Sequence, residues 1–183
     1  TSGFSLSGTD AGNYSLTQPS YLAANVTAKA LTISGVSAAN KVYDSTTAAT
    51  LSGGVLSSGA TGASDNLFYS TDTLTLNTTT AGVFNNKNVG TGKAVTTSGF
   101  SLSGTDAGNY SLTQPSYLAA NVTAKALTIS GVSAANKVYD STTAATLSGG
   151  VLSSGATGAS DNLFYSTDTL TLNTTTAGVY NNK

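Results

Sequence analysis

The sequence contains no cysteine, histidine, arginine, glutamate, methionine or tryptophan. Without cysteine and histidine it has no disulfide framework, no zinc site of the common types, no cysteine nucleophile and no Ser-His-Asp triad. Without arginine, and with a formal net charge of −1 at pH 7, it lacks both the basic patch of a nucleic-acid surface and a polybasic membrane anchor. These absences exclude most site chemistries and predict that nucleic acid is not a partner.

What remains is rich in small hydroxyl residues and residues that form sheets. Serine and threonine account for 58 of the 183 residues, hydrophobic residues for 39% and charged residues for 8%. Threonine, valine, isoleucine, tyrosine and phenylalanine fit pleated sheets, and few strong helix formers are left. No apolar run approaches the about 20 residues of a membrane span, and no signal peptide begins the chain. We predict an all-β protein without membrane insertion. We also expect the sequence to be an excised or mature piece of a longer chain.

An internal repeat dominates the sequence. Residues 1–87 recur as residues 97–183, and the only difference is Phe84 in the first copy against Tyr180 in the second. The period of 96 residues is the size of a small domain and exceeds the about 20–50 residues of solenoid repeats. The added hydroxyl suits a packed ring whose tip reaches water or a partner.

The alternation of apolar residues changes parity near residue 29 and again one period later. Such a shift reverses the buried face of a strand, as expected where one domain ends and the next begins. We therefore place unit boundaries after Lys29 and after Lys125. The chain then consists of the C-terminal part of an upstream repeat (1–29), one complete repeat unit (30–125) and the N-terminal part of a downstream repeat (126–183). No linker rich in proline or glycine separates the units, so we expect short, stiff junctions.

Short β-forming runs between turn residues predict an all-β fold. We expect tandem small β-sandwich or β-grasp-like domains in an elongated array. The predicted strands of the complete unit are 31–34, 41–43, 49–51, 66–70, 73–77, 82–84, 93–97, 100–102, 111–114 and 117–123. The predicted turns are 44–46, 52–54, 58–60, 62–65, 85–88 and 104–109. The predicted core residues are Leu31, Ile33, Val42, Leu51, Leu67, Tyr69, Leu74, Leu76, Phe84, Val95, Phe100, Leu102, Leu112, Leu118 and Val122.

The segment at residues 41–50, KVYDSTTAAT, resembles the signature of YDG/MBG-type repeats. These repeats occur in large secreted bacterial adhesins of the filamentous-haemagglutinin, two-partner-secreted type. Residues 98–115 and 121–129 are similar to the rest of that repeat, and the segments follow in the family's order. The family's glycine after Tyr-Asp is Ser45 here and Ser141 in the second copy, so a positive φ is not expected at this turn.

The resemblance implies an extracellular protein of the bacterial cell surface, in which such units form stalks or fibres, and it implies no catalytic residues. We expect a spacer or filament-forming module whose partners are neighbouring repeats or copies of the same protein. Other cells or surfaces would be reached through a distal region outside this chain. The alternatives are a repeated low-affinity glycan- or surface-binding module and a subunit of a self-assembling extracellular filament. In the latter, residues 1–29 and 126–183 of different molecules complete each other, without the nine residues equivalent to 88–96.

Candidate modification and metal sites each have a plain structural alternative. Asp106 and Asn109, with Asp10 and Asn13 in the other copy, are candidate Ca²⁺ ligands. Calcium prefers about six to eight oxygens, however, and Asp and Asn are common turn residues. Six Asn-X-Ser/Thr sequons, close to the number expected by chance, are candidate glycosylation sites: Asn13, Asn25, Asn77, Asn109, Asn121 and Asn173.

Lysine and tyrosine supply the remaining candidates. Lys41 with Asp44, or Lys93 with Asn88, are candidates for an isopeptide cross-link, with ordinary surface charge as the alternative. Tyr43 and Tyr139 are candidate ligand platforms, although a packed ring with its hydroxyl bonded to the turn is the favoured interpretation. No spacing nominates a nucleophile with its base. We therefore predict no enzyme activity, no cofactor and no metal-binding residue.

Overall fold

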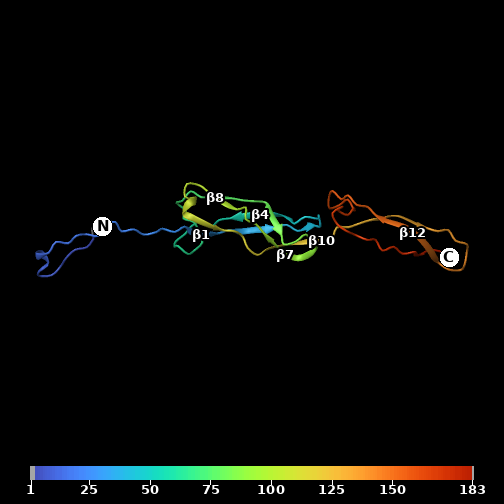
Figure 1. The fold of residues 1–183 in the computed structure, drawn as a ribbon, viewed down its shortest axis with the longest axis horizontal. Coiled ribbons are helices and arrows are strands. Elements are labelled where there is room, and N and C mark those ends of the chain that lie inside the picture. Colours follow the sequence, from blue (N-terminus) through green and yellow to red (C-terminus); the bar gives the residue numbers. More distant parts are fainter. Residues whose placement is uncertain (1–2, 183) are drawn as a thin grey trace.

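The computed structural model describes residues 3–182 and shows an elongated chain that is nearly all β (Figure 1). The helical elements among these residues are two short 3-10 turns, η1 (Ala11–Asn13) and η2 (Ala107–Asn109). No helix in this range is long and apolar enough to cross a membrane. An extended N-terminal segment, a central body and a C-terminal segment follow one another along the long axis (Figure 1). The prediction of an all-β fold is confirmed.

The central body is built around one sheet of six strands, in the order β2-β4-β6-β7-β10-β3. Its neighbouring strands are antiparallel except β10 and β3, which are parallel. Two small sheets, β1-β9 and β5-β8, flank it. The strands are β1 (Lys29–Thr32), β2 (Ser34–Ala38), β3 (Lys41–Val42), β4 (Ala48–Val55), β5 (Thr75–Asn77), β6 (Ala81–Phe84), β7 (Gly90–Thr96), β8 (Ser101–Ser103), β9 (Tyr110–Thr113) and β10 (Leu118–Thr123).

Most of the predicted core is confirmed. The predicted residues that are buried are Leu31, Leu51, Phe84, Val95, Phe100 and Val122. Those packed against them and partly buried include Ile33, Leu76, Leu112 and Leu118. Val42 and Tyr69 are wrong as core residues, because they are 36% and 40% exposed. Val42 lies on the edge strand β3, and the ring of Tyr69 has Lys29 Nζ 5.6 Å from its centroid.

All predicted strands except 66–70 overlap an observed strand. That segment makes only an isolated parallel bridge, between Ser58 and Phe68. The predicted turn at 52–54 is also wrong, because β4 runs through it and pairs with β2. Gly53 has φ +79°, and a Cβ there would lie 2.1 Å from the carbonyl oxygen of Gly35. The glycine therefore permits close approach of two strands instead of a chain reversal.

The turn after Tyr-Asp corrects a second expectation. Ser45 has φ +66° and Ser141 has φ +62°, so both serines adopt the left-handed conformation that was not expected of them. Asp44 holds the turn, because its Oδ1 accepts hydrogen bonds from the Thr46 amide at 2.9 Å and from Lys41 Nζ at 2.7 Å. These bonds offset the cost of a positive φ, about 1–2 kcal/mol for a residue with a Cβ.

The C-terminal segment repeats part of the main sheet. Its strands β11 (Ile129–Ala134), β12 (Ala144–Leu152) and β13 (Ala177–Val179) form a three-stranded antiparallel sheet. The register is the same in both copies, since Val132 pairs with Gly149 as Val36 pairs with Gly53. The segment thus forms β-structure of its own with the sequence of β2, β4 and β6.

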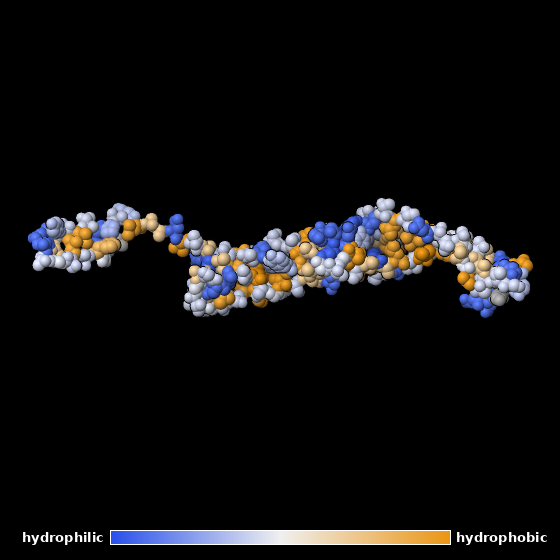
Figure 2. All heavy atoms as spheres, turned by 90° about the horizontal axis from the view of Figure 1, so that it is seen from below, coloured by the Kyte–Doolittle hydropathy of each residue, from blue (hydrophilic) through white to orange (hydrophobic). Residues whose placement is uncertain are grey.

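The N-terminal segment, residues 3–28, contains no strand. Its sequence is that of β8, β9 and β10, yet its apolar side chains are exposed, as the hydrophobic surface in Figure 2 shows. Val26 is 99% exposed, whereas the equivalent Val122 is 1% exposed. Phe4 is 63% exposed, whereas Phe100 is 3% exposed. The segment therefore lacks the partner surface that the same residues have in the central body.

Candidate functional site: the joint between the central body and the C-terminal segment

The connection between the central body and the C-terminal segment is short. One residue separates the end of β10 from Lys125, whose Nζ donates to Asp161 Oδ1 at 2.7 Å. Lys29 makes the same contact with Asp65, at 2.6 Å. Each lysine is thus anchored to an aspartate of the segment that follows it. The unit boundaries after these lysines stay a prediction, but the chain between the two bodies has almost no free length.

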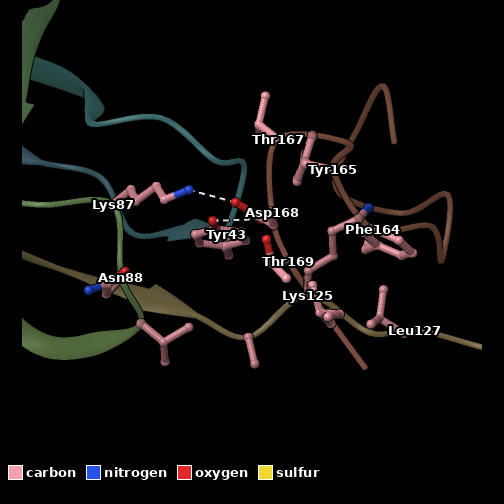
Figure 3. A pocket seen from close by; sticks show the side chains of 13 residues that line it. Tyr43, Lys87, Asn88, Lys125, Leu127, Phe164, Tyr165, Thr167, Asp168 and Thr169 are labelled. Atoms are coloured by element: carbon pink, nitrogen blue, oxygen red, sulfur yellow. Dashed lines mark hydrogen bonds and ion pairs between the residues drawn. The ribbon is translucent and has the colours of Figure 1, made fainter. Parts of the chain in front are cut away.

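Asp168 of the C-terminal segment is the centre of the contact between the two bodies (Figure 3). Its Oδ2 accepts a hydrogen bond from Tyr43 Oη at 2.7 Å, and its Oδ1 forms an ion pair with Lys87 Nζ at 2.5 Å. The side chain of Asp168 is 14% exposed and that of Lys87 is 40% exposed. Beside them, Ser45 Oγ and Thr167 Oγ1 lie 2.9 Å apart. Two loops of the central body therefore bind one carboxylate of its neighbour.

Aromatic contacts reinforce this polar centre. The rings of Tyr43 and Tyr165 meet edge to face with centroids 6.1 Å apart. Lys87 Nζ lies 5.7 Å from the centroid of the Tyr43 ring. Such aromatic and cation–π pairs add about 0.5–1.5 kcal/mol each beyond burial when well placed. The side chain of Tyr43 thus contacts the Tyr165 ring and Lys87 with its ring, and Asp168 with its hydroxyl.

The charges at the joint stabilise each other. The pKa of the Asp168 carboxyl is held below its usual range, mainly by the hydrogen bond from Lys87 and to a smaller extent by that from Tyr43. The bond to Asp168, followed by the interaction with Tyr43, raises the pKa of Lys87. Both groups therefore stay charged over a wide range around neutral pH, and the ion pair is intact there.

The structure changes the interpretation of Tyr43 and Tyr139. The Tyr43 ring is half-buried, but its hydroxyl bonds Asp168 across the joint and not its own turn. Tyr139, with the same sequence around it, is 73% exposed. Asp168 and Lys87 were not among the candidates, because no motif marks either residue. They lie 81 positions apart, so only the fold brings them together.

The proposed cross-link residues make ordinary polar contacts. Lys41 Nζ pairs with Asp44 Oδ1 at 2.7 Å within the turn. Lys93 is buried, and its Nζ donates to Asn86 Oδ1 at 2.5 Å and not to Asn88. The candidate pair of Lys93 and Asn88 is therefore not brought together.

In the central body, three of the calcium and glycosylation candidates make hydrogen bonds within the fold. Asp106 Oδ2 accepts a hydrogen bond from the Thr73 amide at 2.8 Å. Within residues 3–182, no group of three or more acidic side chains could hold a metal ion. Asn121 Oδ1 accepts from the Gly92 amide at 2.8 Å. Asn77 bonds Ser101 across the β5-β8 pair at 3.2 Å.

These features define a nearly all-β chain whose repeated sequence meets its own copy through a Tyr-Lys-Asp contact. The YDG domain family matches residues 27–117 and 123–183. The matched ranges cover most of the chain, which therefore belongs to the YDG domain family. The comparison with curated proteins and the comparison with solved structures give no match.

Proposed function

We propose that this chain is a segment of a bacterial adhesin stalk or extracellular fibre, in which YDG units joined end to end act as a spacer or filament. The observation that carries the proposal is the joint at Asp168, where one residue of free chain and a three-residue polar contact connect two copies of the repeat. The two sides of the joint are different surfaces. A head-to-tail contact of this kind can repeat without closing into a ring, and so builds a tandem β array.

An extracellular place on the bacterial cell surface is supported by the family and by composition. The sequence segments follow the order of the repeats found in filamentous-haemagglutinin-like, two-partner-secreted adhesins. Low charge and abundant threonine suit an exposed sheet surface, and a net charge near zero permits lateral association of fibres. The partners in this proposal are neighbouring repeats and further copies of the same protein.

The mechanical part of the proposal is testable because the chain has no native cysteine. Spin labels on Thr91→Cys and Ala159→Cys, both exposed positions on opposite sides of the joint, report the distance distribution between the two bodies. We expect a narrow distribution in the otherwise unchanged chain and a broad one with Asp168→Ala. Asp10→Ala, which removes an exposed carboxyl far from the joint, is the matched control. Equally broad distributions with and without Asp168 contradict a stiff spacer.

A glycan-binding module is the second candidate, and one observation favours it. A cavity of about 520 Å³ opens at the joint and is lined by Tyr43, Phe164 and Tyr165 (Figure 3). Aromatic rings beside polar groups are typical of sites that take small ligands. Isothermal titration with maltohexaose and chitohexaose tests this candidate. Saturable binding that Phe164→Ser abolishes favours it over the spacer function.

A further inference from the structure

The loop between β6 and β7 carries Lys87 to the joint. The amide of Asn85 donates to the carbonyl oxygen of Ala94 at 3.1 Å, which ties the start of the loop to β7. Asn86 Oδ1 accepts a hydrogen bond from the Asn88 amide at 3.0 Å, and a side chain that bonds the backbone two residues on closes a tight turn. Lys87 therefore lies at the middle of a turn that its two neighbours close.

A buried lysine holds this turn from the inner face of the sheet. Lys93 lies on the same face of β7 as Val95, and both are buried. Its Nζ donates to Asn86 Oδ1 at 2.5 Å, the oxygen that also accepts the Asn88 amide. A Cβ on Gly90 would lie 3.2 Å from Cγ and Cδ of Lys93, so the glycine leaves room for the lysine stem. The turn is thus bonded both along its own backbone and to the face of the sheet.

Lys93 differs from the other lysines that the structure describes. Each of those forms an ion pair with an aspartate: Lys29, Lys41, Lys87, Lys125 and Lys137. Among the described residues, Lys93 has the neutral amide of Asn86 as its side-chain partner. Burying an ammonium group without an opposite charge is costly, and an apolar side chain of similar volume is often at least as stable at such a position. Packing of the core therefore does not account for a lysine here.

We propose that Lys93 and Asn86 are positioning residues for the joint, because they fix the turn from which Lys87 reaches Asp168. The inference rests on the proposed function, since it concerns the stiffness of the same contact. Lys87 Nζ lies 2.5 Å from Asp168 Oδ1, although the Lys87 side chain is 40% exposed. Ordering a long, exposed side chain costs conformational entropy. A backbone that is already held by Asn86 lowers that cost when the two bodies dock.

Lys93→Met in the full chain tests the inference, because it keeps the apolar stem and removes Nζ. We expect the urea midpoint of unfolding to stay unchanged or to rise. We also expect spin labels on Thr50→Cys and Ala159→Cys, both exposed, to report a broadened distance distribution, as with Lys87→Met. Lys29→Met is the matched control and leaves the distribution narrow. It removes the head group of a side chain that is 10% exposed, in β1 toward the opposite end of the central body (Figure 1).

The titration of Asp168 reports whether Lys87 still reaches its partner. The hydrogen bond from Lys87 is the main cause that holds the pKa of Asp168 below 3.8. With Lys93→Met, carboxyl-carbon NMR should therefore show the pKa of Asp168 rising toward 3.8. Asn86→Asp retains an acceptor for both Lys93 and the Asn88 amide, so it should keep the distance distribution narrow. Asn86→Ala removes that acceptor and should broaden it.

The outcome is separable from that of the proposed function. A narrow distribution and an unchanged pKa of Asp168 with Lys93→Met overturn the inference, and the spacer function stands if Asp168→Ala still broadens the distribution. Equal broadening by Lys29→Met, or by Asn86→Asp, also overturns the inference, because neither variant removes the bonds that close the turn. If Lys93→Met lowers the urea midpoint, the comparison of Asn86→Asp with Asn86→Ala decides. A distribution that is broad in the otherwise unchanged chain contradicts the spacer function itself.

Discussion

The only difference between the two copies, Phe84 against Tyr180, gives a sharp test of the packing. Phe84 is 2% exposed, and a buried hydroxyl without a partner costs about 1–3 kcal/mol. In the second copy, however, Tyr180 Oη donates to the carbonyl oxygen of Ala135. The equivalent acceptor in the central body is the Ala39 carbonyl. A satisfied hydrogen bond contributes about 0.5–1.5 kcal/mol, so Phe84→Tyr should change the free energy of unfolding by less than about 1 kcal/mol.

The local geometry supports this expectation. The amide of Phe84 donates to the carbonyl oxygen of Thr47 at 2.8 Å, and the amide of Tyr180 donates to that of Thr143 at 2.7 Å. The backbone hydrogen bond at this position is therefore the same in both copies. A lysine Nζ lies over each ring, at 5.3 Å from the Phe84 centroid and 5.6 Å from the Tyr180 centroid. The central body differs in having β7, whose Val95 pairs with Phe84.

Urea and thermal unfolding followed by far-UV circular dichroism measure the effect. Phe84→Tyr should shift the melting temperature by less than about 5 °C, whereas Phe84→Ala, at about 3–5 kcal/mol, should lower it by more than about 12 °C. Tyr180→Phe is the matched change in the other copy and should cost about 1 kcal/mol or less. Destabilisation by Phe84→Tyr of more than about 2 kcal/mol refutes the reasoning, since it means that the hydroxyl has no acceptor.

Three further predictions use the same chain. Gly53→Ala should lower the free energy of unfolding by about 2 kcal/mol or more, measured in urea, because its Cβ would meet the Gly35 carbonyl oxygen at 2.1 Å. Leu31→Ala, at a fully buried side chain, should cost about 2–5 kcal/mol in the same assay. The pKa of Asp168 lies below its ordinary 3.8 and that of Lys87 above its ordinary 10.5. The joint should therefore be tight at neutral pH, loosen below pH 3.8 as Asp168 protonates, and loosen above pH 10.5 as Lys87 deprotonates. Spin-label widths against pH measure this.

Strands whose apolar residues alternate could be predicted from the sequence. Strands that form only because they pair with another strand could not. The alternation at Leu118 and Val122 predicted β10 correctly, and the burial of Phe84 and Val95 followed from the same reasoning. In contrast, β2 has the sequence SGVSA, which carries one large apolar residue. It becomes a strand because it pairs with β4, whose glycines were taken for a turn. Pairing between segments of weak local preference depends on the tertiary fold and has no local signal.

The joint shows the same limit more strongly. Tyr43 was a candidate because it lies in the signature segment, but its partner Asp168 is 125 positions away and in another copy of the repeat. An aspartate in a Ser-Thr-Asp turn is ordinary turn chemistry when the sequence is considered locally. The informative signal was the near-identity of the copies, since it means that each unit carries both sides of the same contact.

The Asp168 carboxylate and its equivalent in the central body bind different tyrosine hydroxyls. In the central body, the equivalent carboxylate, Asp72, accepts a hydrogen bond from Tyr110, whose hydroxyl in turn accepts from the Tyr69 amide. Tyr110 is 8% exposed and lies in β9, which pairs with β1 at the start of the unit. In the central body this carboxylate therefore binds a tyrosine of its own unit, whereas Asp168 binds Tyr43 of the other body. A tyrosine hydroxyl is thus the partner of this carboxylate in both copies, and the fold determines which tyrosine supplies it, because neither Tyr110 nor Tyr43 is near its aspartate in sequence.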